Sequence, residues 1–121
     1  MNYYKTSDGK EVSQQSIDRL LSASYRQYPG LQSCECCGAV AVDHSHIISQ
    51  ARCKVIQKTE LIWSRENWFF ACRSCHMEWE AIKGGRWANF RNVARLLQVL
   101  KRHDPEGYQK RLNVLDEMVE I

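Results

Sequence analysis

Four cysteines in two Cys-x2-Cys pairs are the residues of this 121-residue chain that are best suited to bind a metal ion. The pairs are Cys34 with Cys37 and Cys72 with Cys75. A spacing of two residues lets both sulfurs of a pair point at one tetrahedral centre, and two pairs supply the four thiolates of a structural zinc site. We therefore expect one Zn2+ that stabilises a small fold.

The first pair allows a second interpretation, because a third cysteine lies inside it. The run from Cys34 to Gly38 reads CECCG, so Cys36 competes with Cys34 for the role of first ligand. We choose Cys34 with Cys37, followed by the glycine that suits a tight turn, which leaves Cys36 and Cys53 outside the site. Disulfide bonds are the alternative, but the polar start of the chain shows no signal segment and favours a reducing cytosol.

A second group of chemically useful side chains lies beside these pairs. The run Asp43-His44-Ser45-His46 falls between them, and His76 follows the last cysteine directly. A carboxylate and an imidazole can hold a divalent ion that keeps open positions for substrate and water. A further imidazole can accept a proton near neutral pH. These residue types indicate metal and base chemistry next to the four cysteines.

Short strands and helices must position these residues, and the pattern predicts an α+β fold in one domain, residues 1–121. Apolar residues at helical spacing predict a helix over 13–28 that ends at Pro29-Gly30. A strand that begins at Ala39 is expected to end in the histidines, and residues 49–58 form a loop or a short helix. We further expect a strand over 68–71, a helix opened by His76 and interrupted at Gly84-Gly85, and C-terminal helices over 87–102 and from 105 onward.

Positive charge is concentrated after the second cysteine pair. The net charge of the chain is +3, but residues 83–111 carry eight basic and two acidic side chains. A basic stripe beside a metal site suggests a polyanion such as a nucleic-acid backbone. The alternative is an ordinary solvated helix face. No stretch approaches the roughly 20 apolar residues that a membrane span needs, so no membrane partner is expected.

The chain carries, in this order, a first cysteine pair, the Asp-His-x-His run, Asn67, and a second cysteine pair followed by histidine. This combination resembles the HNH (ββα-metal) endonucleases. The matching segments are Asp43 to Ile48, Glu66-Asn67-Trp68 and Cys72 to His76. The resemblance covers about residues 34–82 and is closest to phage and bacterial members with a four-cysteine zinc site. It implies a two-stranded hairpin followed by a helix, with flanking helices over 13–28 and 87–121.

The resemblance also implies a reaction, the hydrolysis of DNA phosphodiester bonds with one divalent ion such as Mg2+ or Mn2+. Asp43 and His76 would hold that ion, which acts as a Lewis acid at the scissile phosphate and the leaving oxygen. A histidine would deprotonate the attacking water. Asn67 would tie the loop between the two strands through side-chain to backbone hydrogen bonds and so hold that histidine.

Two histidines compete for the role of general base. His44 and His46 are two residues apart, so they face the same way in a strand. Many HNH enzymes have an adjacent Asp-His pair, which favours His44, whereas the His46-Ile47-Ile48 wording and the Asp-His-x-His members favour His46. We choose His46, with His44 as a metal ligand or a phosphate-orienting group. One of the two can also have a packing role only.

A zinc-stapled nucleic-acid-binding module without catalysis is the alternative function, because the same cysteines and basic stripe would serve it. A mixed site with His44 or His46 in place of a cysteine is a third interpretation that four well-spaced thiols make unnecessary. The expected partner is double-stranded or branched DNA, in the cytoplasm of a bacterial host and encoded by the bacterium or a phage. A double-strand break needs two active sites or two encounters, so the apolar flanking helices form a homodimer interface or simply cover the hairpin.

Overall fold

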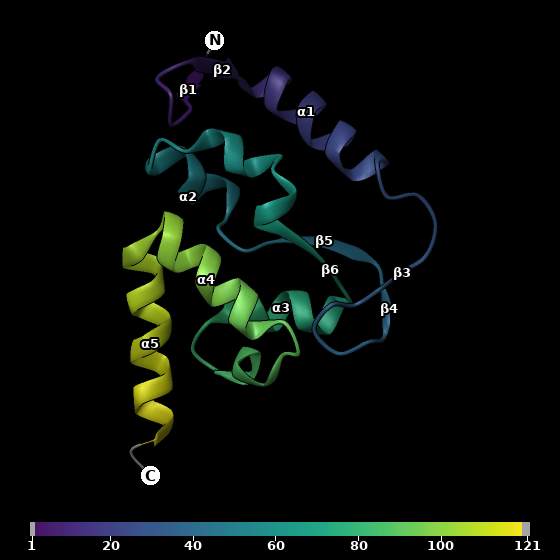
Figure 1. The fold of residues 1–121 in the computed structure, drawn as a ribbon, viewed down its shortest axis with the longest axis vertical. Helices are drawn as coiled ribbons and strands as arrows, with labels where there is room; N and C mark the ends of the chain where they lie inside the picture. The colour runs from purple at the N-terminus through teal and green to yellow at the C-terminus, as the bar shows by residue number, and fades with distance from the viewer. Residues whose placement is uncertain (1, 120–121) are drawn as a thin grey trace. The chain divides into compact units, whose positions relative to one another are not determined.

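A computed structural model describes residues 2–119 of the chain (Figure 1). The expected α+β class is confirmed, since helices are combined with two-stranded sheets, β1–β2, β3–β4 and β5–β6. The chain forms two compact units that are interleaved in sequence. The first unit comprises Met1–Gly30 and Ile48–Trp68, and the second comprises Leu31–Ile47 and Phe69–Ile121.

The first unit begins with a β-hairpin that was not predicted. β1 (Tyr3–Lys5) pairs antiparallel with β2 (Glu11–Ser13), with Tyr4 opposite Val12. The turn between them contains Gly9 at φ +85°, a left-handed conformation that glycine adopts without a steric cost. The Asp-Gly pair in this turn is a hairpin signal that is visible in the sequence.

Helix α1 (Gln14–Arg26) follows the hairpin and is two residues shorter at its C-terminal end than the predicted helix over 13–28. Ser13 caps it, because its hydroxyl accepts from the backbone N–H of Ser16 at 3.2 Å. Ile17 faces inward and is fully buried. The indole N–H of Trp68 donates to Ser24 Oγ at 3.0 Å, which joins the helix to the end of the unit's second segment.

The second segment of the first unit is helical, and the short helix that was one of the two expectations for residues 49–58 is observed. It contains α2 (Gln50–Val55) and the 3-10 helices η1 (Thr59–Ile62) and η2 (Arg65–Asn67). The Thr59 hydroxyl donates to the carbonyl of Lys5 at 2.6 Å and thereby connects this segment to the hairpin.

The second unit contains two small sheets, one of which carries His44 and His46, and the cysteine pairs lie beside their strands. β3 (Gln32–Ser33) and β4 (Val40–Ala41) pair antiparallel, and β5 (Asp43–His46) pairs with β6 (Trp68–Ala71). The run that was expected to form one strand ending in the histidines is therefore split at Val42 into β4 and β5. The predicted strand over 68–71 is observed with the same bounds.

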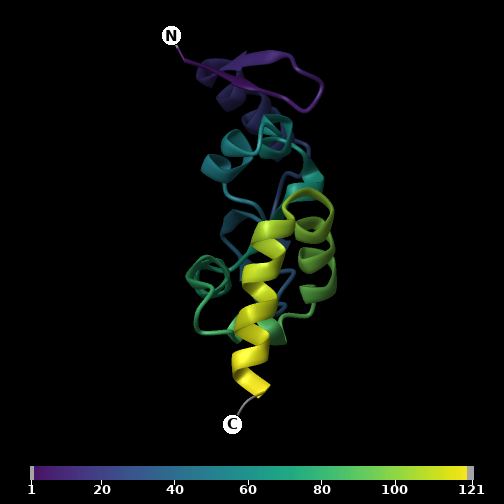
Figure 2. The same ribbon diagram turned by 90° about the vertical axis from the view of Figure 1, so that its left-hand side faces the viewer.

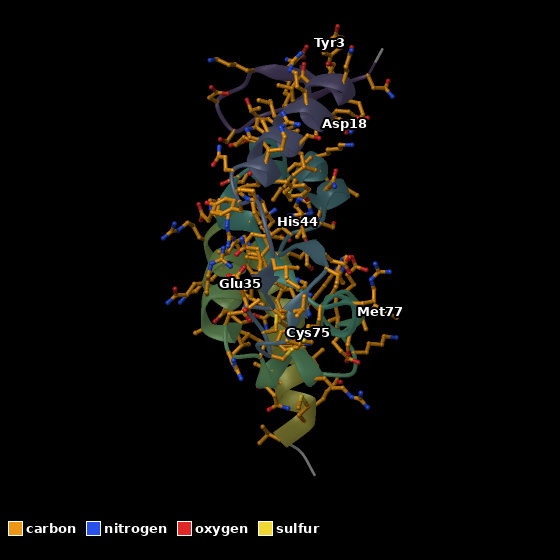
Figure 3. All side chains as sticks on the ribbon, turned by 90° about the vertical axis from the view of Figure 1, so that its right-hand side faces the viewer. Tyr3, Asp18, Glu35, His44, Cys75 and Met77 are labelled. Carbon is orange, nitrogen blue, oxygen red and sulfur yellow. The ribbon has the colours of Figure 1, made fainter. Side chains whose placement is uncertain are left out.

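Helix α3 (Arg73–Ala81) starts three residues before His76, which corrects the prediction that His76 opens it. Cys75 and Trp79 lie on its buried face, whereas Met77 is 62% exposed and is seen at the surface in Figure 3. The helix ends in a γ-turn, with Ile82 at φ 59°, ψ −60° and a Lys83 N–H to Ala81 carbonyl bond of 2.5 Å. It therefore stops before the glycines that were expected to interrupt it.

Two helices complete the second unit and lie side by side (Figures 1 and 2). The predicted helix over 87–102 is observed as a 3-10 turn, η3 (Arg86–Asn89), followed by α4 (Val93–His103). Helix α5 (Pro105–Val119) begins at the predicted proline, and Asp104 accepts from the Gly107 N–H at 3.2 Å. Residues 120 and 121 of the predicted extension lie outside the described residues.

Candidate metal centre

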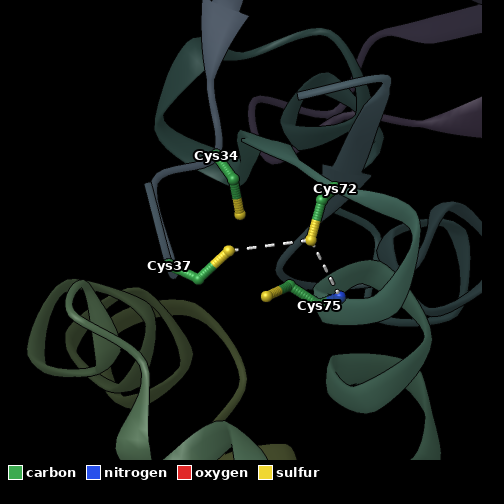
Figure 4. Close-up of side chains that lie close together, drawn as sticks. All are labelled: Cys34, Cys37, Cys72 and Cys75. Atoms are coloured by element: carbon green, nitrogen blue, oxygen red, sulfur yellow. Dashed lines mark hydrogen bonds between the residues drawn. The ribbon is translucent and has the colours of Figure 1, made fainter. Parts of the chain in front are cut away.

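The four predicted cysteines converge on one point of the second unit (Figure 4). Their sulfur atoms all lie within 4.8 Å of one another, and Cys37 Sγ is 3.8 Å from Cys72 Sγ. A tetrahedral site with Zn–S bonds of about 2.3 Å separates its sulfurs by roughly 3.8 Å. The arrangement is thus compatible with a structural zinc, and all six cysteines of the chain are free rather than disulfide-bonded.

The first pair is held in the turn that connects β3 to β4. The Cys34 N–H donates to the carbonyl of Ala39 at 2.6 Å, and the Gly38 N–H donates back to the carbonyl of Cys34 at 2.9 Å. Gly38 has φ +85°, and a Cβ atom there would lie 2.5 Å from Nη1 of Arg91. Both the backbone conformation and the packed guanidinium therefore require glycine after the second cysteine.

The second pair is held by the start of α3. Cys72 is the N-cap of the helix, and its sulfur accepts from the backbone N–H of Cys75 at 3.5 Å. The same residue's carbonyl accepts from the His76 N–H at 3.0 Å. One ligand thus ends β6, and the other lies in the first helical turn, directly before His76.

Glu35, which lies between the ligands of the first pair, connects that pair to β6. Its N–H donates to the carbonyl of Phe70 at 2.9 Å, and its carboxylate accepts from the Phe70 N–H at 2.6 Å. Arg95 Nη1 lies 3.8 Å from the other carboxylate oxygen. Because Phe70 is two residues before Cys72, these hydrogen bonds hold the second cysteine pair close to the first.

The thiols differ in how easily they ionise. Burial alone would raise the pKa of Cys34, but backbone N–H groups of Cys72, Cys36 and Cys37 donate to its sulfur and lower the pKa to about 6. Burial, together with the neighbouring Cys34, raises the pKa of Cys36 to about 12. Burial and the neighbouring thiols also raise the pKa of Cys75, so the convergence of the four sulfurs, rather than their ionisation, distinguishes the ligands from Cys36.

Asp43 and His76, the predicted ligands of a second metal ion, are in direct contact. Asp43 Oδ2 lies 3.1 Å from His76 Nδ1, and the imidazole Nε2 lies 2.9 Å from Glu80 Oε1, one helical turn further along α3. Asp43 also accepts from Arg73 Nε at 2.7 Å and from Nη2 at 3.0 Å. The hydrogen bonds from Arg73 and then from His76 hold the pKa of Asp43 below its ordinary value.

The 3.1 Å between Asp43 Oδ2 and His76 Nδ1 is a hydrogen-bond distance, and it is also close to the separation of two neighbouring metal ligands. Two ligand atoms in neighbouring positions of an octahedral ion, each about 2.1 Å from the metal, are roughly 3 Å apart. The ring of His76 has a carboxylate at each nitrogen, so it can donate to both only when it carries two protons. An ion at Nδ1 would take the place of one proton, and the Nε2–H bond to Glu80 would fix the ring's orientation.

The candidate general bases lie on β5. Ser45 is fully buried while His44 and His46 are half-buried, which places the two imidazoles together on one face and Asp43 with Ser45 on the other. The ring of His44 lies 5.5 Å from that of Phe70. The indole N–H of Trp79 donates to the carbonyl of Ile47 at 3.1 Å and so packs α3 against the end of the strand.

Asn67 is fully buried in the first unit. Its Oδ1 accepts from the N–H of Ile48 at 2.8 Å, and its Nδ2 donates to the carbonyls of Ile48 at 2.9 Å and Leu61 at 3.2 Å. These are side-chain to backbone bonds at both ends of the segment that connects β5 to β6. Ile48 is two residues beyond His46 in the chain, and the role of Asn67 in holding a base stays a prediction.

The basic segment 83–111 is not one exposed stripe. Arg95 lies near Glu35, and Arg86 Nη1 is 3.5 Å from Glu78. Arg111 is 5% exposed, with its guanidinium 3.6 Å from the centre of the Trp79 ring, and it donates to that residue's carbonyl at 2.8 Å. Burial lowers the pKa of Arg111 to about 10. At least this arginine stabilises the packing of α5 rather than facing a polyanion.

Two residues of the Asp43–His76 group were missed by the sequence prediction, Arg73 and Glu80. Glu80 follows His76 by four residues, a spacing that places two side chains on the same face of a helix. This contact could therefore have been predicted from the sequence. Arg73 is one residue after a cysteine ligand, where nothing in the sequence distinguishes a partner of Asp43 from a solvated side chain.

No family model matches this chain, and no curated protein or solved structure matches it either. Among residues 2–119, none of the helices has the length and apolar character needed to cross a membrane.

Proposed function

We propose that this chain is a metal-dependent DNA endonuclease of the HNH (ββα-metal) type, which hydrolyses phosphodiester bonds. The contact between Asp43 on β5 and His76 on α3, next to the four cysteines, carries this proposal. The order of β5, β6 and α3, two strands followed by a helix, is what that fold requires and supports the proposal. A module that only binds nucleic acid has no need for a carboxylate and an imidazole at ligand spacing.

In this proposal the four cysteines hold one structural zinc. Cys34, Cys37, Cys72 and Cys75 come from two separate segments, so a shared ion closes the loop between them and stabilises the fold. With all four positions of a tetrahedral ion occupied by thiolates, no position remains for substrate. The structural site is therefore separate from the catalytic one.

Asp43 and His76 would hold the catalytic ion, Mg2+, Mn2+ or a similar divalent cation. When bound, such an ion supplies Lewis acidity at the scissile phosphate and stabilises charge on the leaving oxygen. Asp43 contributes the hard oxygen ligand and His76 the nitrogen ligand. Glu80 accepts from the far side of the imidazole and keeps its Nδ1 directed at the carboxylate.

His46 would be the general base, with His44 beside it as a second ligand or a phosphate-orienting group. β5 belongs to a two-stranded sheet, so one of its edges has no strand partner among the described residues. The proposal requires a phosphate bound at an edge of the strand to contact Asp43 from one face of β5 and His46 from the other. Asn67 would restrain the backbone just beyond His46 through its bonds to Ile48.

Cleavage of supercoiled plasmid by the purified, zinc-loaded protein tests this function. We expect nicked or linear products with Mg2+ or Mn2+ and none with EDTA. Asp43→Asn keeps the size of the side chain but removes its charge, and it should abolish cleavage while leaving the zinc in place. DNA binding without cleavage under any divalent ion would favour the non-catalytic binding module instead.

A further inference from the structure

Arg73 occupies the carboxylate that the catalytic ion would need. Its Nε lies 2.7 Å from Asp43 Oδ2, the same oxygen that contacts His76 Nδ1, and its Nη2 lies 3.0 Å from Oδ1. The guanidinium thus forms a two-point contact with both oxygens of Asp43. A divalent ion cannot bind between Asp43 Oδ2 and His76 Nδ1 while the Arg73 nitrogen remains at that oxygen.

The two partners of this ion pair differ in their freedom to move. The side chain of Asp43 is 14% exposed and is also held by His76, whereas that of Arg73 is 71% exposed. Because the guanidinium is largely exposed and screened by solvent, a metal ion can displace it from Asp43. Arg73 then moves away from Asp43 but stays in the first turn of α3, next to the ligands.

We propose that Arg73 alternates between Asp43 in the metal-free protein and a phosphate of the DNA strand in the metal-loaded protein. This inference rests on the proposed function, since it concerns the same Asp43–His76 site. A guanidinium binds phosphate as it binds carboxylate, through two parallel N–H bonds. The exchange couples loading of the metal to binding of the substrate, because the ion releases the side chain that the phosphate then engages.

Binding of Mn2+ to the zinc-loaded protein without DNA, followed by its electron paramagnetic resonance signal, tests the first half of this exchange. Arg73→Gln should bind Mn2+ about two- to fivefold more tightly than the parent, because it removes a competitor of modest strength. A merely structural role would weaken binding instead. Arg19→Gln, which removes the same charge from the exposed face of α1, should leave the Mn2+ affinity unchanged.

Binding of a short labelled DNA duplex tests the second half, in a His46→Ala background that prevents cleavage. In Mn2+, Arg73→Gln should lower DNA affinity and reduce the slope of log affinity against log salt by about one, for one lost phosphate contact. Arg73→Lys should keep that slope, since the charge remains. In zinc-loaded protein without added Mn2+, where Arg73 stays on Asp43, parent and Arg73→Gln should bind DNA with similar salt slopes.

The outcomes separate the inference from the function on which it rests. Equal or weaker Mn2+ binding by Arg73→Gln, or an unchanged salt slope in Mn2+, overturns the role of Arg73 and leaves the nuclease proposal standing. If the parent shows no Mn2+ binding that Asp43→Ala weakens, both the catalytic site and the exchange are overturned.

Discussion

At the residue scale, the imidazole of His76 is fixed from two directions. Asp43 lies at Nδ1 of the ring and Glu80 at Nε2. The backbone N–H of the same residue donates to the carbonyl of Cys72. The orientation of the ring therefore does not depend on a bound ion. A ligand that is oriented in advance loses little conformational freedom when the ion binds.

Removal of either proposed ligand should weaken the catalytic ion without unfolding the protein. We expect Asp43→Ala and His76→Ala to lose cleavage in Mg2+ and to regain part of it in excess Mn2+, because one ligand and the ion's own water molecules remain. Calorimetric titration of the divalent ion into zinc-loaded protein measures the loss of affinity directly. Unchanged affinity in both variants would place the ion elsewhere.

The two histidines of β5 can be distinguished by their pH response. His46→Ala should reduce the cleavage rate by about a hundred- to ten-thousandfold, the usual contribution of a general base, while zinc content and DNA binding persist. High pH should partly restore it, because hydroxide replaces the missing base. His44→Ala should cost less. A dead His44→Ala variant with an active His46→Ala variant would reverse the assignment of the base.

The raised pKa of Tyr25 leads us to expect a lower free energy of unfolding at alkaline pH. Burial raises its pKa from 10.0 to about 12, so the neutral phenol is favoured in the folded state. Its contribution to the free energy of unfolding is complete below pH 10 and is lost as the pH rises toward 12. Denaturant unfolding at several pH values should show a smaller alkaline loss for Tyr25→Phe than for the parent, and equal losses would contradict this origin.

Single residues also show where prediction from sequence succeeds and where it ends. The spacing of the cysteines identified the four converging thiols, because a Cys-x2-Cys pair is a local structure with a defined geometry. The partners of Asp43 could be anticipated only in part. His76 was found through the family resemblance, but the contact from Arg73 depends on how α3 packs beside β5, which no local pattern encodes.

At the scale of elements, the two turns that hold the cysteines are connected before any ion binds. The backbone and the carboxylate of Glu35 both bond to Phe70, on the strand that leads into Cys72. This connection sets the positions of the two pairs, and the ion then joins sulfurs that are already close. The four sulfurs are thus held close together by the protein's own hydrogen bonds, an arrangement compatible with structural zinc.

Loss of any one of the four thiols should therefore destabilise the whole second unit. Cys→Ser at positions 34, 37, 72 or 75 should give protein with less than one zinc per chain and a much lower melting temperature, as measured by metal analysis and circular dichroism. Cys36→Ser and Cys53→Ser are the matched controls and should keep their zinc. Zinc loss in Cys36→Ser with retention in Cys34→Ser would contradict the observed set.

Helix boundaries were less predictable than helix existence. All of the predicted helices have observed counterparts, yet α3 ends at Ala81 because Ile82 adopts a positive φ. A β-branched residue rarely takes this conformation, so the sequence points to the following glycines as the stop. The carbonyl of Ile82 accepts from the indole N–H of Trp87 at 2.8 Å, a tertiary contact that compensates the local strain.

At the scale of the molecule, the distribution of charge needs the structure to be interpreted. The count of eight basic residues over 83–111 is correct, but Arg111 is buried and Arg91 covers Gly38 of the first cysteine turn. The expectation of a polyanion-binding stripe was built on the count of charges along the chain, which cannot show that an arginine stacks on a tryptophan. Lys83 and Arg86, in contrast, lie at the surface, although Arg86 also pairs with Glu78.

The basic residues should consequently separate into two classes. Lys83→Ala with Arg86→Ala should lower DNA affinity and reduce the salt slope by about two, with little change in melting temperature. Arg91→Ala and Arg111→Ala should instead lower the melting temperature, because they remove packing. Lys10→Ala, an exposed lysine beside Asp8, is the control for charge alone. An unchanged slope in the Lys83/Arg86 variant would return these residues to the solvated-face interpretation.

The interleaving of the two units has a consequence for the newly made chain. Cys72 follows Cys34 by 38 residues, so at about 5–20 residues per second the ribosome delivers the second thiol pair roughly 2 to 8 s after the first. In that interval the first unit is still unfinished, because its second segment, Ile48–Trp68, emerges between the two pairs. Until then, Cys34 and Cys37 are only half of the four-cysteine set, with Cys36 beside them as a competing thiol. The four-cysteine cluster can therefore close only after the whole second segment of the first unit has been synthesised.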